Sequence, residues 1–188
     1  ETPWVSAHLS MLPPGVAWLA VHAGLYLPGP DPKTSFSTLV EQVKALQAQV
    51  ELPILLENMP SFPTRRYIHE VAPVLIRRVL EETGAGFLLD LPHARTAAHV
   101  LGLDVHNYLA QLPLECTRQI HVCGPRVRRR RFGKPVLVDA HEPMQAEDYA
   151  LLEWTLGRTN PEVVTLEYFK EKGPLAEQLA RLAEILGR

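Results

Sequence analysis

Short apolar runs alternate with longer amphipathic segments along the whole chain. The segment 35–50 has apolar residues at positions 36, 39, 40, 43, 46 and 50, which is the spacing of one face of a helix. The segment 53–57 is apolar almost throughout, which is typical of a strand buried on both faces. We expect strands at 4–9, 17–23, 53–57, 87–90, 117–122, 136–138 and 163–167, and helices at 35–50, 64–82, 94–101, 105–111, 146–155 and 175–186.

Apolar strands separated by helices favour parallel βαβ units, in which helices cover the sheet. About five of the predicted strands are followed by a convincing helix. A complete eight-stranded barrel usually needs about 250 residues, whereas this chain has 188. We therefore predict one metal-binding domain over residues 1–188, with an α/β fold that is a (β/α) TIM barrel incomplete at its N-terminus. Because Glu1 is not an initiator methionine, we expect processing or missing upstream sequence.

The composition is that of an ordinary globular domain, with 46% hydrophobic residues, 21% charged residues and a net charge of −2. This charge argues against overall electrostatic attraction to nucleic acid or to an anionic membrane, and the apolar runs are too short to span a bilayer. Cys116 and Cys123 are separated by an odd offset, which places them on opposite faces of an extended segment. We therefore expect no disulfide and a reducing, cytoplasmic compartment.

Histidines and carboxylates recur where the predicted strands end. The residues at strand ends are His8, His22, Glu57, Asp90, His121 and Glu167. Asp139 and His141 follow the run 136–138 and share one face of an extended segment, and His93 comes three residues after Asp90. In a parallel barrel all C-terminal strand ends meet at one mouth, so these side chains would converge.

Each of these residues also has a simpler explanation when it is taken singly. A histidine on an apolar strand is commonly a hydrogen-bonded core residue, and Asp90 precedes a predicted helix that it would cap. Burying so many ionisable groups without a cation would be costly, and histidine with carboxylates is the ligand set of zinc, manganese and non-haem iron. We therefore predict that these nine residues form a metal site. His69, His99 and His106 lie on predicted helices or loops, and we expect them at the surface.

An arginine-rich segment follows the strand that carries His121. Arg126 and residues 128–131 form a dense cationic loop, which is either solvated or binds a phosphate or acidic substrate through Arg128 and Arg130. Cys123 shares the face of His121, and we expect it in the core, with a place behind the metal ligands as the alternative.

The order of these motifs resembles that of the xylose-isomerase-like TIM barrels. One similar branch is the endonuclease-IV-like metallophosphodiesterases. The other, similar over longer stretches, is the multinuclear non-haem iron oxidative enzymes of the methanobactin-biosynthesis-B-like family. The segments that carry this second resemblance are 6–10 (SAHLS), 56–62 (LENMPSF), 118–124 (RQIHVCG), 138–141 (VDAH) and 166–167 (LE). That family usually has asparagine where this chain has His93.

The resemblance implies two or three metal ions, with iron favoured and zinc or manganese as alternatives. Glu57, Asp90 and His121 would be catalytic, and Asn58 would bind substrate. Glu57 would bridge two metals with help from Asp90, His121 and Glu167, and the remaining ligands would complete the neighbouring position. The implied reaction is O₂-dependent oxidation of a cysteine in a peptide or of a small thiol.

Two other classes of function remain open. With zinc or manganese, the same ligands would activate water for phosphodiester hydrolysis or support sugar isomerisation. A truncated barrel would also serve as a non-catalytic binding module. The expected partners are a small-molecule or peptide substrate and a second copy of the chain covering the open barrel edge, with neither membrane nor nucleic acid.

Overall fold

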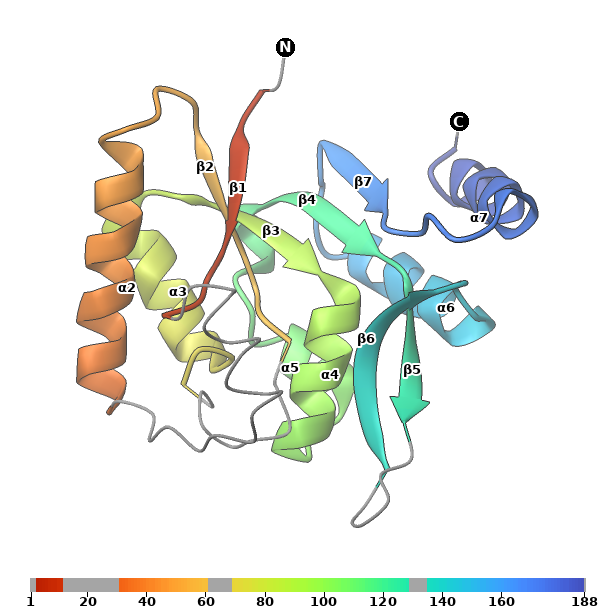
Figure 1. The fold of residues 1–188 in the computed structure, drawn as a ribbon, viewed down its shortest axis with the longest axis horizontal. Helices are drawn as coiled ribbons and strands as arrows, with labels where there is room; N and C mark the ends of the chain where they lie inside the picture. Colours follow the sequence, from red (N-terminus) through yellow and green to blue (C-terminus); the bar gives the residue numbers. More distant parts are fainter. Residues whose placement is uncertain (1–2, 12–30, 61–68, 129–134, 188) are drawn as a thin grey trace.

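The computed structural model describes residues 3–11, 31–60, 69–128 and 135–187, which form an α/β fold (Figure 1). Five parallel strands make one sheet in the order β1–β2–β3–β4–β7. These strands are β1 (Val5–His8), β2 (Ile54–Glu57), β3 (Gly86–Asp90), β4 (Thr117–Val122) and β7 (Val163–Leu166). The parallel α/β sheet confirms the fold class expected from the alternation of strands and helices.

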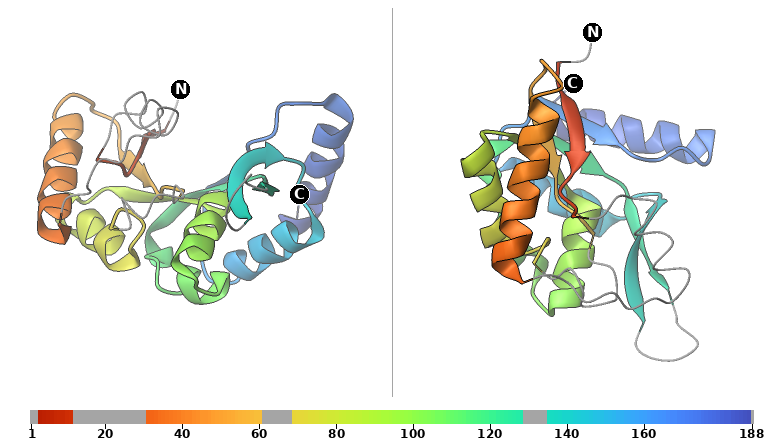
Figure 2. Two further views of the ribbon diagram at one scale, coloured as in Figure 1. Left: turned by 60° about the horizontal axis from the view of Figure 1, so that its bottom comes forward. Right: turned by 60° about the vertical axis from the view of Figure 1, so that its left-hand side comes forward.

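Helices cover one side of this sheet. They are α2 (Pro32–Gln47), α3 (Pro73–Thr83), α4 (Leu91–Leu101), α5 (Val105–Leu109), α6 (Ala146–Leu156) and α7 (Lys172–Ile185), with a 3₁₀ turn at Leu114–Cys116. Figure 2 shows a curved sheet with the helices arranged along its outer side. Within the described residues the sheet is open, with β1 at one edge and β7 at the other.

Prolines and glycines set the helix boundaries. The helix expected over 64–82 begins at Pro73, because a proline lacks the N–H that the first helical turn leaves unpaired and disfavours helical geometry in the residue before it. Residues 64–68 of that prediction lie outside the described residues. The helix ends at Gly84, whose φ of +67° is the left-handed conformation that glycine adopts without strain.

The two faces of the sheet bury different side chains. Leu56 and Leu89 pack in the main core, among the apolar side chains of the helices. Leu55 and Leu88 point to the opposite face, where they form a small cluster with Trp4. Since side chains alternate along a strand, this inner face is also the one that residues 57 and 90 occupy.

The segment 136–138, expected as a strand of the parallel array, belongs to a separate hairpin. It forms part of β6 (Val136–Glu142), which pairs antiparallel with β5 (Gly124–Arg128). The connection between these strands is too short for the crossover that parallel strands require, so the chain turns back on itself. At Gly124 an added Cβ would lie 2.8 Å from the carbonyl oxygen of Glu142, so glycine permits this close approach.

Three further expectations concern a predicted strand, the cysteines and membrane-spanning helices. The strand predicted at 17–23 lies outside the described residues. Cys116 and Cys123 are both free, as predicted. No helix within the described ranges is long and apolar enough to cross a membrane.

Candidate metal centre

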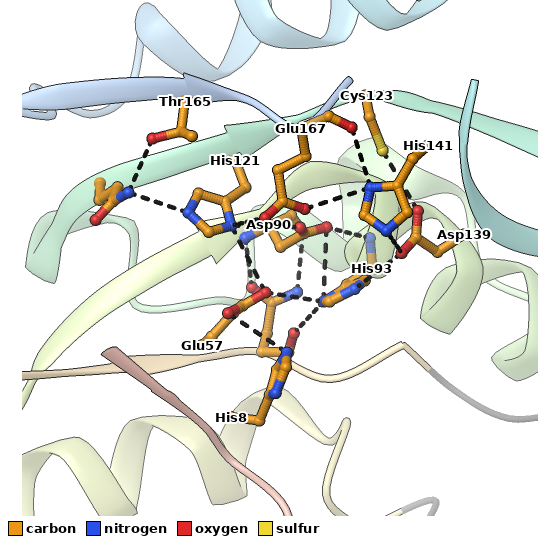
Figure 3. Close-up of polar contacts among 12 residues, drawn as sticks. His8, Glu57, Asp90, His93, His121, Cys123, Asp139, His141, Thr165 and Glu167 are labelled. Carbon is orange, nitrogen blue, oxygen red and sulfur yellow. Dashed lines mark hydrogen bonds and ion pairs between the residues drawn. The ribbon is translucent and has the colours of Figure 1, made fainter. Parts of the chain in front are cut away.

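Strand register brings the predicted metal ligands together where the parallel strands have their C-terminal ends. His8 at the end of β1 pairs with Glu57 at the end of β2, and Asp90 at the end of β3 pairs with His121 on β4. Their side chains converge on the inner face of the sheet, away from the helices (Figure 3). Parallel pairing thus explains why residues distant in sequence share one site.

Glu57 is the carboxylate around which three histidines gather. Its Oε2 lies 3.5 Å from His8 Nε2, and its Oε1 lies 3.4 Å from His93 Nδ1 and 3.8 Å from His121 Nδ1. His121 Nδ1 also lies 3.1 Å from Glu167 Oε1. Glu57 is the residue common to two groups with suitable spacing for a metal, one with His8 and His93 and the other with Asp90 and His121.

The two carboxylate oxygens of Asp90 have different roles, because one caps a helix and the other faces the metal centre. Oδ1 accepts a hydrogen bond of 2.6 Å from His93 N and so caps α4, as its position before a helix suggested. Oδ2 is buried without a hydrogen-bond partner in the described structure, 3.8 Å from His121 Nδ1. This ring nitrogen is also buried and lacks a partner with hydrogen-bond geometry, although carboxylate oxygens lie near it. A buried acceptor and a buried ring nitrogen without hydrogen-bond partners cost stability unless a ligand satisfies them.

The spacing of the donor atoms fits a bound cation. Atoms that bind one ion at about 2.0–2.2 Å lie about 3.0–3.6 Å from one another. The contact of Glu57 with His8, at 3.5 Å, and those of Asp139 with His93 and His141, at 3.4 and 3.3 Å, fall in this range, although they are longer than ordinary hydrogen bonds. The residues present therefore fit a metal ion held by histidine nitrogens and carboxylate oxygens.

A second group of donors surrounds Asp139, on β6. Its Oδ2 lies 3.4 Å from His93 Nε2 and 3.3 Å from His141 Nε2, and its Oδ1 accepts a hydrogen bond of 3.3 Å from Cys123 Sγ. Cys123, Asp139 and His141 form a third group with metal-ligand spacing. His141 has a φ of +47°, a conformation uncommon for a residue other than glycine. Such local strain is typical of functional sites.

Side-chain amides hold the ligands in place. Asn58 is fully buried, and its side chain donates to Asp90 O and accepts from Asp90 N, at 3.0 and 2.8 Å. Gln119 Nε2 lies 3.0 Å from His121 Nε2 and donates to Thr165 Oγ1, while its Oε1 accepts from Trp4 Nε1. These bonds fix the orientation of His121 and the ends of β2 and β3.

Charge pairing shifts the pKa values of the central groups in opposite directions. Burial raises the pKa of Glu57, but hydrogen bonds from His121 and His8 outweigh it and bring this pKa to about 2. Burial lowers the pKa of His121, but Glu167 and Glu57 outweigh it and bring this pKa to about 10. In the metal-free protein the imidazole is therefore protonated at neutral pH and compensates the carboxylates.

The groups beside Asp139 follow the same pattern. Burial lowers the pKa of His93, yet the nearby Asp90 and Asp139 raise it to about 9. Burial raises the pKa of Asp139, but His93 brings it down to about 2. Burial raises the pKa of Asp90 to about 7. Burial and the charges of Asp139 and Asp90 raise the pKa of the Cys123 thiol.

Eight of the nine predicted ligands lie in this cluster, namely His8, Glu57, Asp90, His93, His121, Asp139, His141 and Glu167. His22 lies outside the described residues. The expected surface position holds for His99 and His106, which are exposed, whereas His69 is half-buried.

The residues predicted to bind substrate either lie apart from the cluster or are hydrogen-bonded to the protein backbone. Asn58 has no exposed surface, and its side chain is bonded to the backbone of Asp90, so this geometry corresponds to a positioning residue. Arg128 is exposed at the end of β5 and pairs with Val136, about 10 Å along the strand from Asp139. Arg130 lies outside the described residues.

Sequence reasoning missed Gln119 and favoured a core position for Cys123 over one behind the metal ligands. Gln119 and Cys123 lie two residues before and after His121, so the two-residue period of a strand already puts all three on one face. Cys123 is buried as expected, but its thiol contacts Asp139 as well as the core.

Comparison with known proteins places the chain among relatives of similar sequence. Residues 1–186 match the family model of the RiPP precursor modification enzyme MbnB/TglH/ChrH. A UPF0276 protein of Bordetella parapertussis is 35% identical over 140 residues, covering 72% of this chain and 48% of that protein. A UPF0276 protein of Caulobacter vibrioides is 29% identical over 180 residues, covering 95% of this chain and 61% of that protein. The chain spans about half the length of the curated relatives it matches.

A solved structure shares the fold. A D-tagatose 3-epimerase-like protein matches 98% of this chain and 62% of its own, with a TM-score of 0.55 and 19% sequence identity. This match shows that the open parallel sheet described here shares its α/β fold with that protein. Because the family model covers nearly the whole length, the chain belongs to the RiPP precursor modification enzyme MbnB/TglH/ChrH family.

Proposed function

We propose that this chain is a metal-dependent oxidative enzyme that uses two or three non-haem iron ions to oxidise a cysteine in a peptide or a small thiol. The family supports a modification enzyme that acts on a peptide precursor. The observation that carries the metal assignment is the position of Glu57, which is shared by two groups of ligand atoms. One of these groups contains two buried atoms that make no hydrogen bond in the described structure, Asp90 Oδ2 and His121 Nδ1.

The ligands divide into neighbouring positions around Glu57. His8 with Glu57 would hold one ion, and Glu57, Asp90 and His121 would hold a second, with Glu167 adjacent to His121. Asp139 and His141 would contribute to a further position. A carboxylate with two oxygens facing different imidazoles is suited to bridging two cations.

Iron bound here would allow O₂ to accept electrons from a substrate thiol. The chain's own residues would hold the ligands in one geometry and keep bulk water away. Asn58 fixes the backbone of Asp90, and the Gln119 amide holds the ring of His121. Asp90 and His121 are nearly inaccessible to solvent, which strengthens their electrostatic interaction with a cation.

The test is reconstitution of metal-free protein with iron(II) under anaerobic conditions. We expect about two or three equivalents of iron to bind, as measured by elemental analysis. The loaded protein is then exposed to O₂ with cysteine, glutathione and short peptides that contain one cysteine. We expect O₂ consumption that depends on at least one of these thiols, with a change in the mass of the thiol product.

Two results would contradict this function. The first is protein that binds no iron under these conditions. The second is protein loaded with zinc or manganese that hydrolyses a phosphodiester or isomerises a ketohexose, while the iron-loaded form consumes no O₂ with any thiol. The second result would favour the hydrolase or isomerase chemistry that the same ligands allow.

A further inference from the structure

Cys123 lies inside the candidate metal centre, although the proposed reaction does not use it. It directly follows β4, and its side chain is buried. Its Sγ donates a hydrogen bond to Asp139 Oδ1, and the ligating atoms of Cys123, Asp139 and His141 all lie within 4.8 Å of one another (Figure 3). The thiol therefore faces a carboxylate and an imidazole.

His93 and His141 direct the same ring atom at the other oxygen of this carboxylate. Their Nε2 atoms lie 3.4 and 3.3 Å from Asp139 Oδ2. Their Nδ1 atoms lie 2.8 Å from Asn58 O and 3.0 Å from Glu167 O. Because a carbonyl oxygen only accepts, each neutral ring carries its proton on Nδ1 and its lone pair on Nε2.

This orientation identifies Nε2 as the ligand atom of both rings. A metal-binding histidine typically donates its other ring N–H to a backbone carbonyl or a carboxylate, which fixes the ring and its tautomer. His93 Nδ1 is engaged in the hydrogen bond to Asn58 O, so only Nε2 of this ring is free to bind a metal ion. Because Nε2 faces Asp139, we assign His93 to the metal position beside Asp139 and not to the one beside His8. Two nitrogen lone pairs directed at one carboxylate oxygen are favourable when a cation lies among them.

We propose that Cys123 is a thiolate ligand in a four-donor metal position completed by Asp139, His141 and His93. The inference rests on the proposed function, because it assigns one position of the same metal centre. Binding exchanges the S–H bond for a sulfur–metal bond and releases one proton to solvent, with no change in oxidation state.

The donor set determines which ion this position takes. Cys123, Asp139 and His141 have metal-ligand spacing, and His93 contacts the same carboxylate. Together they would supply one sulfur, two nitrogens and one oxygen, the number of protein donors in a structural zinc site. A thiolate favours softer ions, and a given site binds zinc more tightly than iron(II). We therefore expect zinc here. Iron would then fill the two positions around Glu57, whose donors are nitrogen and oxygen, which is the lower of the two iron counts proposed above.

The test uses cobalt(II) as a spectroscopic substitute for zinc in the 188-residue protein. Metal-free protein is titrated with cobalt(II) alone while its absorption spectrum is recorded. We expect a near-ultraviolet sulfur-to-cobalt charge-transfer band that saturates at one equivalent. One equivalent of zinc should then abolish this band. The Cys123→Ser variant should lack the band, whereas Cys116→Ser should retain it, because Cys116 is the chain's other cysteine and lies in an exposed turn.

The outcomes separate this inference from the proposed function. Cobalt bound with visible d–d bands but no charge-transfer band in the unmodified protein would overturn thiolate ligation and leave the centre around Glu57 standing. Absence of any bound cobalt or iron would contradict both. Loss of the charge-transfer band in Cys116→Ser would show that Cys116 supplies the sulfur, and would overturn the proposal. A band that survives one equivalent of zinc would overturn the preference for zinc. The measurements on unmodified protein do not depend on how well Cys123→Ser folds.

Discussion

His93 and His121 hold protons in the metal-free protein that a bound cation must displace. Their pKa values are raised to about 9 and about 10, compared with about 6.5 in an unfolded chain, because carboxylates surround both rings. Between the unfolded pKa of about 6.5 and the folded pKa values of about 9 and 10, the folded state binds more protons than the unfolded state. The stabilisation is therefore complete below about pH 6.5 and is lost as the pH rises through about 9 to 10.

We accordingly expect the melting temperature of the metal-free protein to fall between pH 7 and pH 10, as followed by circular dichroism. His121→Asn should reduce this dependence, whereas His99→Asn, which changes an exposed histidine, should leave it unchanged. Metal-loaded protein should depend less on pH, because its imidazoles are already neutral. A melting temperature that rises over this range in the metal-free protein would contradict the charge pairing described here.

Asn58 acts on the metal centre through the backbone of Asp90. Asn58→Ala would leave the buried N–H and C=O of Asp90 without side-chain partners, so we expect a loss of about 1–3 kcal/mol in the free energy of unfolding. Metal affinity should fall as well. Urea denaturation and metal titration measure both effects, with the exposed Asn107→Ala as a control that should change stability by less than about 0.5 kcal/mol. Equal stability of the two variants would reject this role.

At the scale of elements, the β5–β6 hairpin carries both metal-site residues and the arginine-rich segment. Asp139 and His141 lie toward its end at the metal centre, and Arg128 lies at the opposite end of the paired region. Arg126 already forms an ion pair of 3.1 Å with Glu142, whereas Arg128 is exposed. The hairpin would therefore bring an anionic substrate to the rim of the site by attraction at a distance.

Neutralising Arg128 and Arg130 to glutamine should raise KM for the thiol peptide that supports O₂ consumption and weaken the dependence of KM on salt. The value of kcat should stay nearly unchanged, since neither side chain would act in the chemical step. Steady-state kinetics at several ionic strengths provide the measurement. If KM is the same in both proteins at every salt concentration, the loop is only solvated.

The sequence predicts the helices and the parallel strands better than the hairpin or the positioning residues. The helix expected at 35–50 is observed as α2, three residues earlier, because Asp31 caps it and Pro32 occupies its first turn. A short run such as 136–138 shows an extended segment but not the direction of its pairing. The roles of Asn58 and Cys123 depend on contacts with Asp90 and Asp139, which lie 32 and 16 positions further along the chain. Periodicity does not encode such contacts.

At the scale of the whole molecule, the described sheet ends on each side in a strand whose outer edge is unpaired. β1 and β7 each pair with one neighbour only within the described residues. His8 on β1 belongs to the candidate metal centre, so whatever covers this edge also lies close to the site. Exposed strand edges favour pairing with another chain.

We therefore expect the 188-residue chain to self-associate, with a mass by light scattering that rises above that of one chain as concentration increases. Metal affinity should rise in parallel, because association would cover the edge strand that carries His8. A monomer at all concentrations, with undiminished metal binding, would show that the edge needs no second copy.

The most direct test of the central claim is the metal content of the protein and of its Glu57→Gln variant, both produced without added metal. Glutamine keeps the size of the side chain but removes the charge that two neighbouring cations would share. Elemental analysis should find at least two metal ions per chain in the unmodified protein, iron among them, and a loss of the ions around residue 57 in the variant. Glu162→Gln, which changes a carboxylate paired with Arg118 outside the site, should retain the full content. Full metal content in Glu57→Gln, or none in the unmodified protein, would contradict the account.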